Sequence, residues 1–388
     1  MELVTNEKAL EPDTKINYQF KVLYAIGIIF VVAGHANAND IIFWNELIHC
    51  TGWYMAMFVF VSGYFYKSSN DEHPLPYIWR KVKRLMIPYF LWNAFYGIVV
   101  LILSKFGFTI AIPFDWKNFL SRSLYEGSGF KFNLPAWYVI PLFFSEVYNV
   151  LIRFCLKKLT ENKRNIVLLV LNTLIGFFGI YIAMQYTGKI VVGLPLFGTR
   201  LAYFIAFFTF GYMYKMYVEK YDTLSNFWYF TIIISIELLY ILIKGESPVY
   251  SIIGMFNFEN PVLPYIMGLV GLAFWLRIAR ILTPVVGHSK KLNMIADNTF
   301  SIMTNHEFGF FLMNTGFYFL TAVCSLPLKF DVEKYKTTVE YIFLPRGRGF
   351  PMVYVAFAII FSLLIQKLAV FLKGRLYSVY LKVSKKGE

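Results

Sequence analysis

The amino-acid sequence predicts an all-α integral membrane protein, a bundle of about ten transmembrane helices with both termini in the cytoplasm. The first observation behind this prediction is composition: of 388 residues, 58% are hydrophobic and 15% are charged, whereas about 25% are charged in ordinary soluble domains. The second is that the apolar segments are long and do not alternate with polar residues, which favours helices over barrel strands. The third is the distribution of basic residues between the segments. Together they exclude a disordered chain, a coiled coil and an ordinary soluble enzyme.

About ten segments are apolar enough and long enough to cross a bilayer. The second is short and is expected to begin within 41–50, and the ninth carries polar residues and is expected to be bent. No internal repeat or linker divides the chain, so we expect one membrane domain over 1–388, with a polar tail at 1–17 and a basic tail at 373–388. The segments are 18–36, 50–66, 86–104, 136–156, 165–186, 196–214, 227–243, 262–282, 297–324 and 350–372.

Basic residues orient these segments. The net charge of +14 would suggest nucleic-acid binding in a soluble protein. In a membrane protein, however, basic residues gather in cytoplasmic connections and meet anionic lipid headgroups, so no nucleic-acid partner is expected. With the N-terminus inside, the even-numbered connections hold most of the Lys and Arg, whereas the first outer connection, 37–49, holds none. The connection 326–349 is the exception, because its five basic residues lie outside.

The first span carries ionisable residues, which are costly in lipid and are therefore candidates for function. Lys21, Tyr24 and His35 share one stripe of the helix, because each residue advances it by about 100°. Lys21 and His35 then lie about 21 Å apart along the axis. The structural alternatives are a lysine that snorkels at the helix base and an interfacial histidine.

The ninth span holds a polar stripe that ends in His306 and Glu307. Such a stripe normally faces the bundle interior or a wet cavity, although Ser, Thr and Asn also join membrane helices to one another. Glu146 and Glu237 are further acidic residues in apolar spans. For these two we expect a simple pairing with Lys or Arg on neighbouring helices.

A dense basic segment precedes the third span, with Arg80, Lys81, Lys83 and Arg84 close together. Clustered Arg and Lys suit a polyanion such as pyrophosphate, and contact with lipid headgroups is the simpler alternative. The sequence contains no glycine-rich phosphate loop and no zinc motif. Its three cysteines are widely spread, so neither a disulfide nor a metal site is predicted.

Several stretches, taken in order, carry a family resemblance. The first span, Leu23–His35, ends in Gly-His, and the late segment Asp297–His306 also ends in histidine. Between them lie Trp53–Tyr64, the basic run Lys81–Tyr89 and Pro135–Leu142. In this order the five stretches resemble the acyltransferase-3 family of multispanning membrane acyltransferases, whose opening helix ends in a catalytic histidine.

Two positions depart from the family pattern. Tyr24 stands where the family usually has arginine, eleven residues before the histidine. The basic pair is Lys81 and Arg84 rather than two arginines, and lysine keeps the charge but loses the bidentate geometry. Lys21, one turn earlier on the same stripe, is our candidate for the missing cation.

The resemblance implies a membrane-bound O-acyltransferase. It would move an acyl group, usually acetyl, from cytoplasmic acetyl-CoA to a hydroxyl of a surface polysaccharide or its lipid-linked precursor, without a metal. His35 would act as general base or as a transient acyl carrier. The composition, rich in Ile, Lys, Phe and Tyr, is typical of an AT-rich bacterial genome, which predicts the bacterial cytoplasmic membrane as location. The candidate residues are, for catalysis, His35, Lys21, Tyr24 and His306; for the donor, Arg80, Lys81, Lys83 and Arg84; and for the acceptor, Trp137, Ser62 and Glu307.

Two other functions fit the same features. A transporter or flippase for a glycan or lipid-linked sugar would also have a channel, a basic inner rim and aromatic outer segments. The broken spans at matching positions of two halves that favour a transporter are not found in the sequence. A structural partner in a glycan-synthesis complex is the third possibility. His35 separates these alternatives, because an acyltransferase needs it whereas a transporter would tolerate alanine there.

Overall fold

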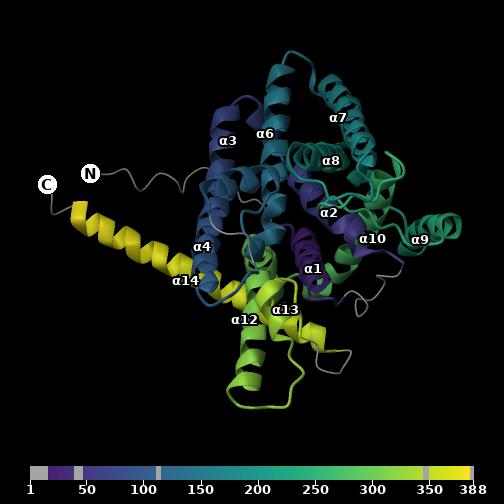
Figure 1. Ribbon diagram of the computed structural model, residues 1–388. Helices are drawn as coiled ribbons and strands as arrows, with labels where there is room; N and C mark the ends of the chain where they lie inside the picture. The colour runs from purple at the N-terminus through teal and green to yellow at the C-terminus, as the bar shows by residue number, and fades with distance from the viewer. Residues whose placement is uncertain (1–15, 39–46, 111–114, 344–348, 385–388) are drawn as a thin grey trace.

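The computed structural model describes residues 16–38, 47–110, 115–343 and 349–384, and these form helices and loops with no β-strand (Figure 1). Residues 1–15 of the predicted polar tail and the last four residues of the basic tail lie outside the described residues. The main helices are α1 (Tyr18–His35), α2 (Cys50–Tyr64), α3 (Pro74–Lys81), α4 (Ile87–Ser104), α6 (Val139–Cys155), α7 (Glu161–Met184), α8 (Gly193–Met213), α9 (Asn226–Lys244), α10 (Leu263–Val286), α11 (Lys290–Asp297), α12 (Thr299–Ala322), α13 (Val332–Thr337) and α14 (Phe350–Ser384).

Eight helical stretches among the described residues are long and apolar enough to cross a membrane. The two remaining predicted spans are α2 and α12. α2 has only 15 residues, and α12 has 24 but carries the polar stripe. The chain therefore has the helices of a multi-pass membrane protein, while the total of about ten spans and the orientation of the termini stay predictions. The eight stretches are Tyr18–His35, Pro74–Ser104, Lys131–Cys155, Glu161–Met184, Gly193–Tyr221, Asn226–Lys244, Leu263–Val286 and Phe350–Arg375.

Several helices extend beyond the predicted boundaries. The third stretch begins at Pro74, because α3 continues through one π-helical turn, Val82–Met86 (η3), into α4. The predicted bend of the ninth span is found at its start, where Asn298 leaves helical geometry (φ −116°, ψ 22°) between α11 and α12. The last helix continues past 372 to Ser384, so most of the predicted basic tail is helical.

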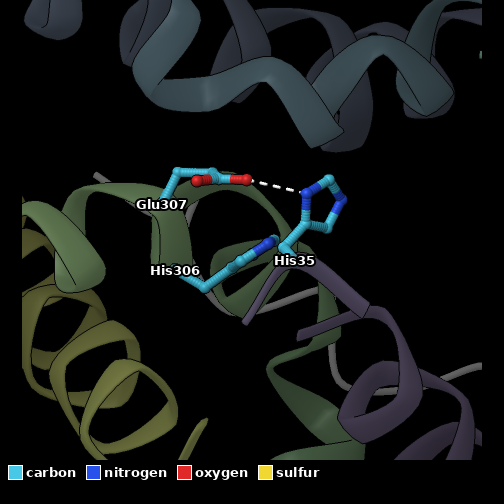
Figure 2. Close-up of side chains that lie close together, drawn as sticks. All are labelled: His35, His306 and Glu307. Carbon is cyan, nitrogen blue, oxygen red and sulfur yellow. Dashed lines mark ion pairs between the residues drawn. The ribbon is translucent and has the colours of Figure 1, made fainter. Parts of the chain in front are cut away.

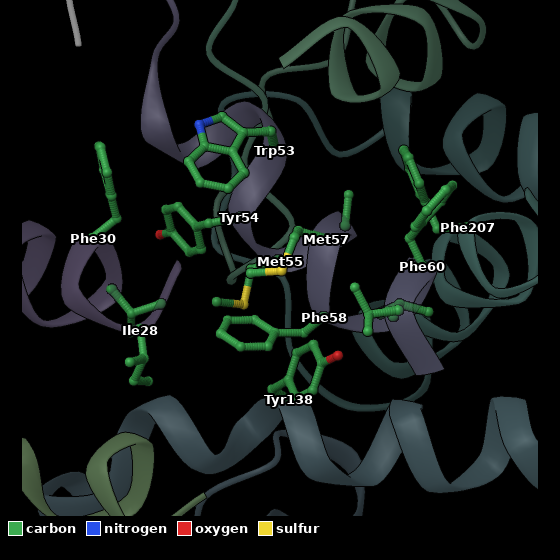
Figure 3. Close-up of a cluster of buried hydrophobic side chains, with 14 of the residues drawn as sticks. Ile28, Phe30, Trp53, Tyr54, Met55, Met57, Phe58, Phe60, Tyr138 and Phe207 are labelled. Atoms are coloured by element: carbon green, nitrogen blue, oxygen red, sulfur yellow. The ribbon is translucent and has the colours of Figure 1, made fainter. Parts of the chain in front are cut away.

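α2 lies at the centre of the bundle, packed against α1, α8 and α10. The side chains from Trp53 to Val61 are all buried, as expected for a helix that is apolar all round. Figure 3 shows this core, in which side chains of α2 contact Ile28 and Phe30 of α1 and Phe207 of α8. The indole rings of Trp53 and Trp275 stack with their centroids 5.3 Å apart, which joins α2 to α10.

Two glycines allow α2 and α8 to cross closely. A Cβ added to Gly63 would lie 1.9 Å from the carbonyl oxygen of Phe208, and one added to Gly211 would lie 1.8 Å from that of Phe60. Each helix thus places a glycine against the backbone of the other. Small residues at helix crossings are the common means of close packing in membranes.

A buried carboxylate joins the connection after α2 to the ends of α6 and α7. Asp71 accepts a hydrogen bond from the Tyr66 hydroxyl at 2.6 Å, and its Oδ2 lies 3.2 Å from the Arg164 guanidinium. Arg153, also buried, stands 4.0 Å from the same oxygen. Burial raises the pKa of the Asp71 carboxyl above its ordinary value, and the Tyr66 hydrogen bond and the two arginines offset part of this rise.

Candidate active site

His35 is the last residue of α1, and the local sequence explains why the helix ends there. Asn37 has a positive φ of 53°, a conformation that asparagine tolerates better than most residues. The chain reverses at this point, and the Ala38 N–H donates to the Ala33 carbonyl at 2.9 Å, as in a common helix C-terminal motif. The imidazole therefore projects from the end of a rigid helix.

Two neighbouring residues of α12 meet His35 (Figure 2). Its Nδ1 lies 2.8 Å from Oε1 of Glu307, and its ring centroid lies 5.2 Å from that of His306. The Glu307 side chain is 1% exposed and the His35 side chain 24% exposed, so the carboxylate is shielded while the imidazole stays accessible. The structure thus brings together three of the predicted site residues, from the two ends of the chain.

The contact with Glu307 fixes how the His35 ring presents its nitrogens. The carboxylate oxygen can only accept, so the ion-pair contact favours the form of the ring that carries a proton on Nδ1. In the neutral ring the lone pair is then on Nε2, which suits a general base. A carboxylate that orients a histidine in this way is a recurrent arrangement in acyl-transfer enzymes.

His306 is held by its own helix. Its Nδ1 lies 2.8 Å from the carbonyl oxygen of Ile302, and since a carbonyl only accepts, Nδ1 carries the proton and Nε2 the lone pair. The Nε2 atom of His306 and both carboxylate oxygens of Glu307 are buried and have no hydrogen-bond partner among the described residues. Three buried acceptor atoms without a hydrogen bond therefore lie beside His35, and one of them, Oε1, forms the ion-pair contact with its Nδ1.

A cavity of about 210 Å³ lies between α1, α2, α3, α6 and α12. It brings together Tyr24, Ser62 and Lys81 from the predicted site. The Lys81 Nζ atom forms an ion pair with Oε1 of Glu146 at 2.7 Å, so the expected pairing of Glu146 with a basic neighbour is confirmed. Oε2 of Glu146 and the hydroxyl of Tyr138, which also line the cavity, lack hydrogen-bond partners among the described residues.

The predicted basic cluster is divided between two environments. Lys81 points into the cavity, whereas Lys83 and Arg84 are exposed. Arg80 is exposed as well and donates to Oδ1 of Asn70 at 2.7 Å. The four cations therefore do not form a single site.

Lys21 lies near the opposite end of α1 from His35, and Trp137 packs against Arg200. Lys21 pairs with Asp297 at 2.9 Å near the start of α1, about 21 Å along the helix from the imidazole. Trp137 is buried, and the guanidinium of Arg200 stands 4.2 Å from the centroid of its ring. Arg200 in turn donates to the carbonyls of Glu126 and Ile252, so Trp137 takes part in packing between α8 and the segments around these two residues.

Other polar residues of α12 join helices, as the structural alternative for this stripe proposed. Asn305 accepts from the Tyr96 hydroxyl at 2.6 Å, Ser301 donates to the Ser362 carbonyl at 3.0 Å, and Asn314 accepts from the Tyr354 hydroxyl. The prediction that Glu237 pairs with a basic neighbour is wrong for the described residues. Its buried carboxyl forms no ion pair with any of them, and its Oε2 has no hydrogen bond. α9 is peripheral, and its one basic residue, Lys244, pairs with Glu259.

Tyr138 and the proximity of Glu146 to Tyr24 in the cavity were not predicted from the sequence. Glu146 could be noticed in the sequence because it is an acidic residue in an apolar span. Nothing in the sequence indicated that it lies beside α1. Glu307, which the sequence placed among the acceptor residues, has its side chain against His35, and this contact could not be read from the sequence.

The site lies part of the way along α12. Glu307 is eight residues from the start of this helix and 15 from its end, or about 12 Å and 22 Å at 1.5 Å per residue. His35 is the last residue of α1, but it contacts α12 at an interior position of that helix.

Comparison with known proteins gives one match, to a protein family. A family model described as the acyltransferase domain, acyltransferase-3, matches residues 17–369. No curated protein and no solved structure gives a significant match. The matched range covers nearly the whole chain and includes His35, His306, Glu307 and the cavity. The chain therefore belongs to the acyltransferase-3 family of membrane acyltransferases.

Proposed function

We propose that this protein is an O-acetyltransferase of the bacterial cytoplasmic membrane. It would transfer an acetyl group from cytoplasmic acetyl-CoA to a hydroxyl of a surface polysaccharide or its lipid-linked precursor. The observation that carries the proposal is the 2.8 Å contact between His35 and the buried Glu307. It supplies an oriented, accessible imidazole in a protein whose family performs acyl transfer.

In the proposed reaction, Nε2 of His35 removes the proton of the acceptor hydroxyl as its oxygen attacks the thioester carbonyl. A carbon–oxygen bond forms, the carbon–sulfur bond breaks, and the leaving thiolate takes the proton from His35. Glu307 is a positioning residue that stabilises the imidazolium formed in between. The alternative is that His35 itself carries the acyl group for part of the cycle.

The cavity is our candidate for the path of the donor. Lys81 lies within it, and Arg80, Lys83 and Arg84 are available nearby for the phosphates of CoA. Ile28 lines the cavity and precedes His35 by seven residues, or about 10 Å. The donor arm would therefore run along α1 toward the imidazole.

The test measures the O-acetyl content of the cell-surface glycan by NMR in the native host. We expect His35→Ala to abolish acetylation, like deletion of the gene, while the glycan remains. In isolated membranes supplied with varied acetyl-CoA, Glu307→Gln should lower the rate of transfer by roughly 10²–10⁴-fold without raising the KM for acetyl-CoA, because the amide no longer imposes the required tautomer. His73→Ala, which replaces an exposed histidine, is the control, and blotting checks that all variants are expressed.

Two outcomes would contradict the proposal. Normal acetylation in the His35→Ala strain would exclude His35 as base and as acyl carrier. Loss of surface glycan in the deletion strain, with unchanged acetylation of the intracellular pool, would favour the transporter.

A further inference from the structure

The cluster of His35, His306 and Glu307 contains the ligand types of a metal site. Each side chain offers one ligand atom, and these atoms lie within 4.8 Å of one another. We propose that the cluster binds a divalent transition-metal ion, Zn²⁺ by its ligand chemistry, and that the bound ion inhibits the enzyme. The inhibition rests on the proposed function, whereas the metal binding does not.

The types of ligand in this cluster favour zinc over calcium and magnesium. Two imidazoles and one carboxylate form a set that zinc uses in its three-ligand sites, with water in the fourth position. Calcium and magnesium prefer oxygen ligands alone, so they are poor candidates for a site with two ring nitrogens.

Two of the three ligands are already in the state that a metal needs. The Ile302 carbonyl holds Nδ1–H of His306, which leaves the lone pair of Nε2 free, and an outer hydrogen bond of this kind orients most metal-binding histidines. Glu307 is buried, and its Oε2 has no hydrogen-bond partner among the described residues. Buried acceptors without a donor are unfavourable, and a cation between them would satisfy both.

The third ligand can move into place. Zinc lies about 2.0–2.2 Å from nitrogen and oxygen ligands, so the cluster has to contract around it. His35 is the most exposed of the three side chains and can rotate to do this. When Nδ1 of His35 binds the ion, its proton passes to solvent and its contact with Glu307 is replaced by a shared metal. A base that depends on this contact is then no longer oriented, so metal binding and catalysis exclude each other.

Direct binding provides the first test. The full chain is purified in detergent with an affinity tag that contains no histidine, and Zn²⁺ affinity is measured by competition with a chromogenic chelator. We expect one tight ion per chain for the wild type and for His73→Ala. His306→Ala and His306→Gln should each weaken Zn²⁺ binding by at least roughly 10–100-fold. Loss of a group that only hydrogen-bonds to a metal ligand already has an effect of this size. Size-exclusion chromatography checks that each variant is folded. Absence of stoichiometric binding, or wild-type affinity in both His306 variants, would overturn the site.

Activity provides the second test. Zn²⁺ added to membranes should inhibit acetyl transfer, and a chelator should restore it. Inhibition of His73→Ala should follow the same concentration curve. Metal binding without any acetyl transfer would refute the proposed function and leave the site standing, whereas active enzyme that binds Zn²⁺ without inhibition would refute the regulatory part.

Discussion

At the scale of single residues, the position of an ionisable group in an apolar span decided what the sequence could predict. His35 and His306 were found because charge and hydrogen-bonding capacity are costly in lipid and so stand out. The partners of these residues could not be predicted, because contacts such as His35 with Glu307 and Lys81 with Glu146 join helices that are far apart in the chain. Periodicity fixes the face of a helix on which a residue lies, but not the helix that it meets.

The ion pair of Lys81 and Glu146 gives a prediction at this scale. Lys81→Ala leaves a carboxylate that is 1% exposed without its partner. Breaking a buried pair costs about 3–5 kcal/mol, and we expect less here because the Lys81 side chain is 26% exposed. Lys81→Met combined with Glu146→Gln should recover most of the thermal stability lost, measured by unfolding in detergent.

Activity of the same variants separates stability from binding. If Lys81 holds the donor, the double variant is stable but has a raised KM for acetyl-CoA. Equal unfolding temperatures for the wild type and Lys81→Ala would show that the pair does not stabilise the fold.

At the scale of elements, apolar length predicted where the helices lie, and most ends fall within a few residues of expectation. The larger differences have local causes. η3 joins α3 to α4 without a break, and the predicted fourth span is preceded by a short 3-10 helix, Lys131–Tyr138. The close crossing of α2 and α8 was not predicted, because a glycine alone does not say which backbone approaches it.

Substitution of Gly63 tests that crossing. Gly63→Ala would push a methyl group against the Phe208 carbonyl and should lower stability by about 1–3 kcal/mol, the usual effect of overpacking. Gly198→Ala on α8 is the matched control, because nothing lies within 4 Å of the added carbon there. We expect this control to be neutral or more stable by up to about 1 kcal/mol. Equal thermal unfolding of the two variants in detergent would exclude a tight crossing.

At the scale of the whole molecule, the sequence predicted a multi-pass helical protein correctly, and eight of its ten predicted spans coincide with helical stretches, among the described residues, that are long and apolar enough to cross a membrane. α2 is too short and α12 too polar to be recognised by length and hydropathy alone. The two helices differ from lipid-facing helices for physical reasons. α2 is enclosed by other helices, and α12 carries the polar residues of the site. The rules that describe lipid-facing helices therefore apply least to the two helices nearest the centre of function.

Two free and exposed cysteines allow a test of topology. Cys155 ends α6, and Cys324 follows α12. In a Cys50→Ser background with both termini inside, a membrane-impermeant maleimide should label Cys324 in intact cells and Cys155 only after permeabilisation. Cys324→Ser should remove the first signal. Labelling of both cysteines from one side would show that the number of spans between them is even, so that the five predicted spans there do not all cross. α12, which is not among the eight apolar stretches, would be the first candidate.

α1 is attached to the α11–α12 segment at both of its ends, by Lys21 with Asp297 and by His35 with Glu307. A helix fastened at two points neither slides nor turns without breaking one of them. Under the proposed chemistry the base is stationary, and the acyl group has to be carried to it over a set distance. The thioester carbonyl lies at the same distance from the CoA sulfur in every acyl-CoA, so a longer acyl chain would present the same atom to the imidazole. Selectivity for acetyl would therefore be governed by the space beyond that carbonyl, into which a longer chain would have to extend.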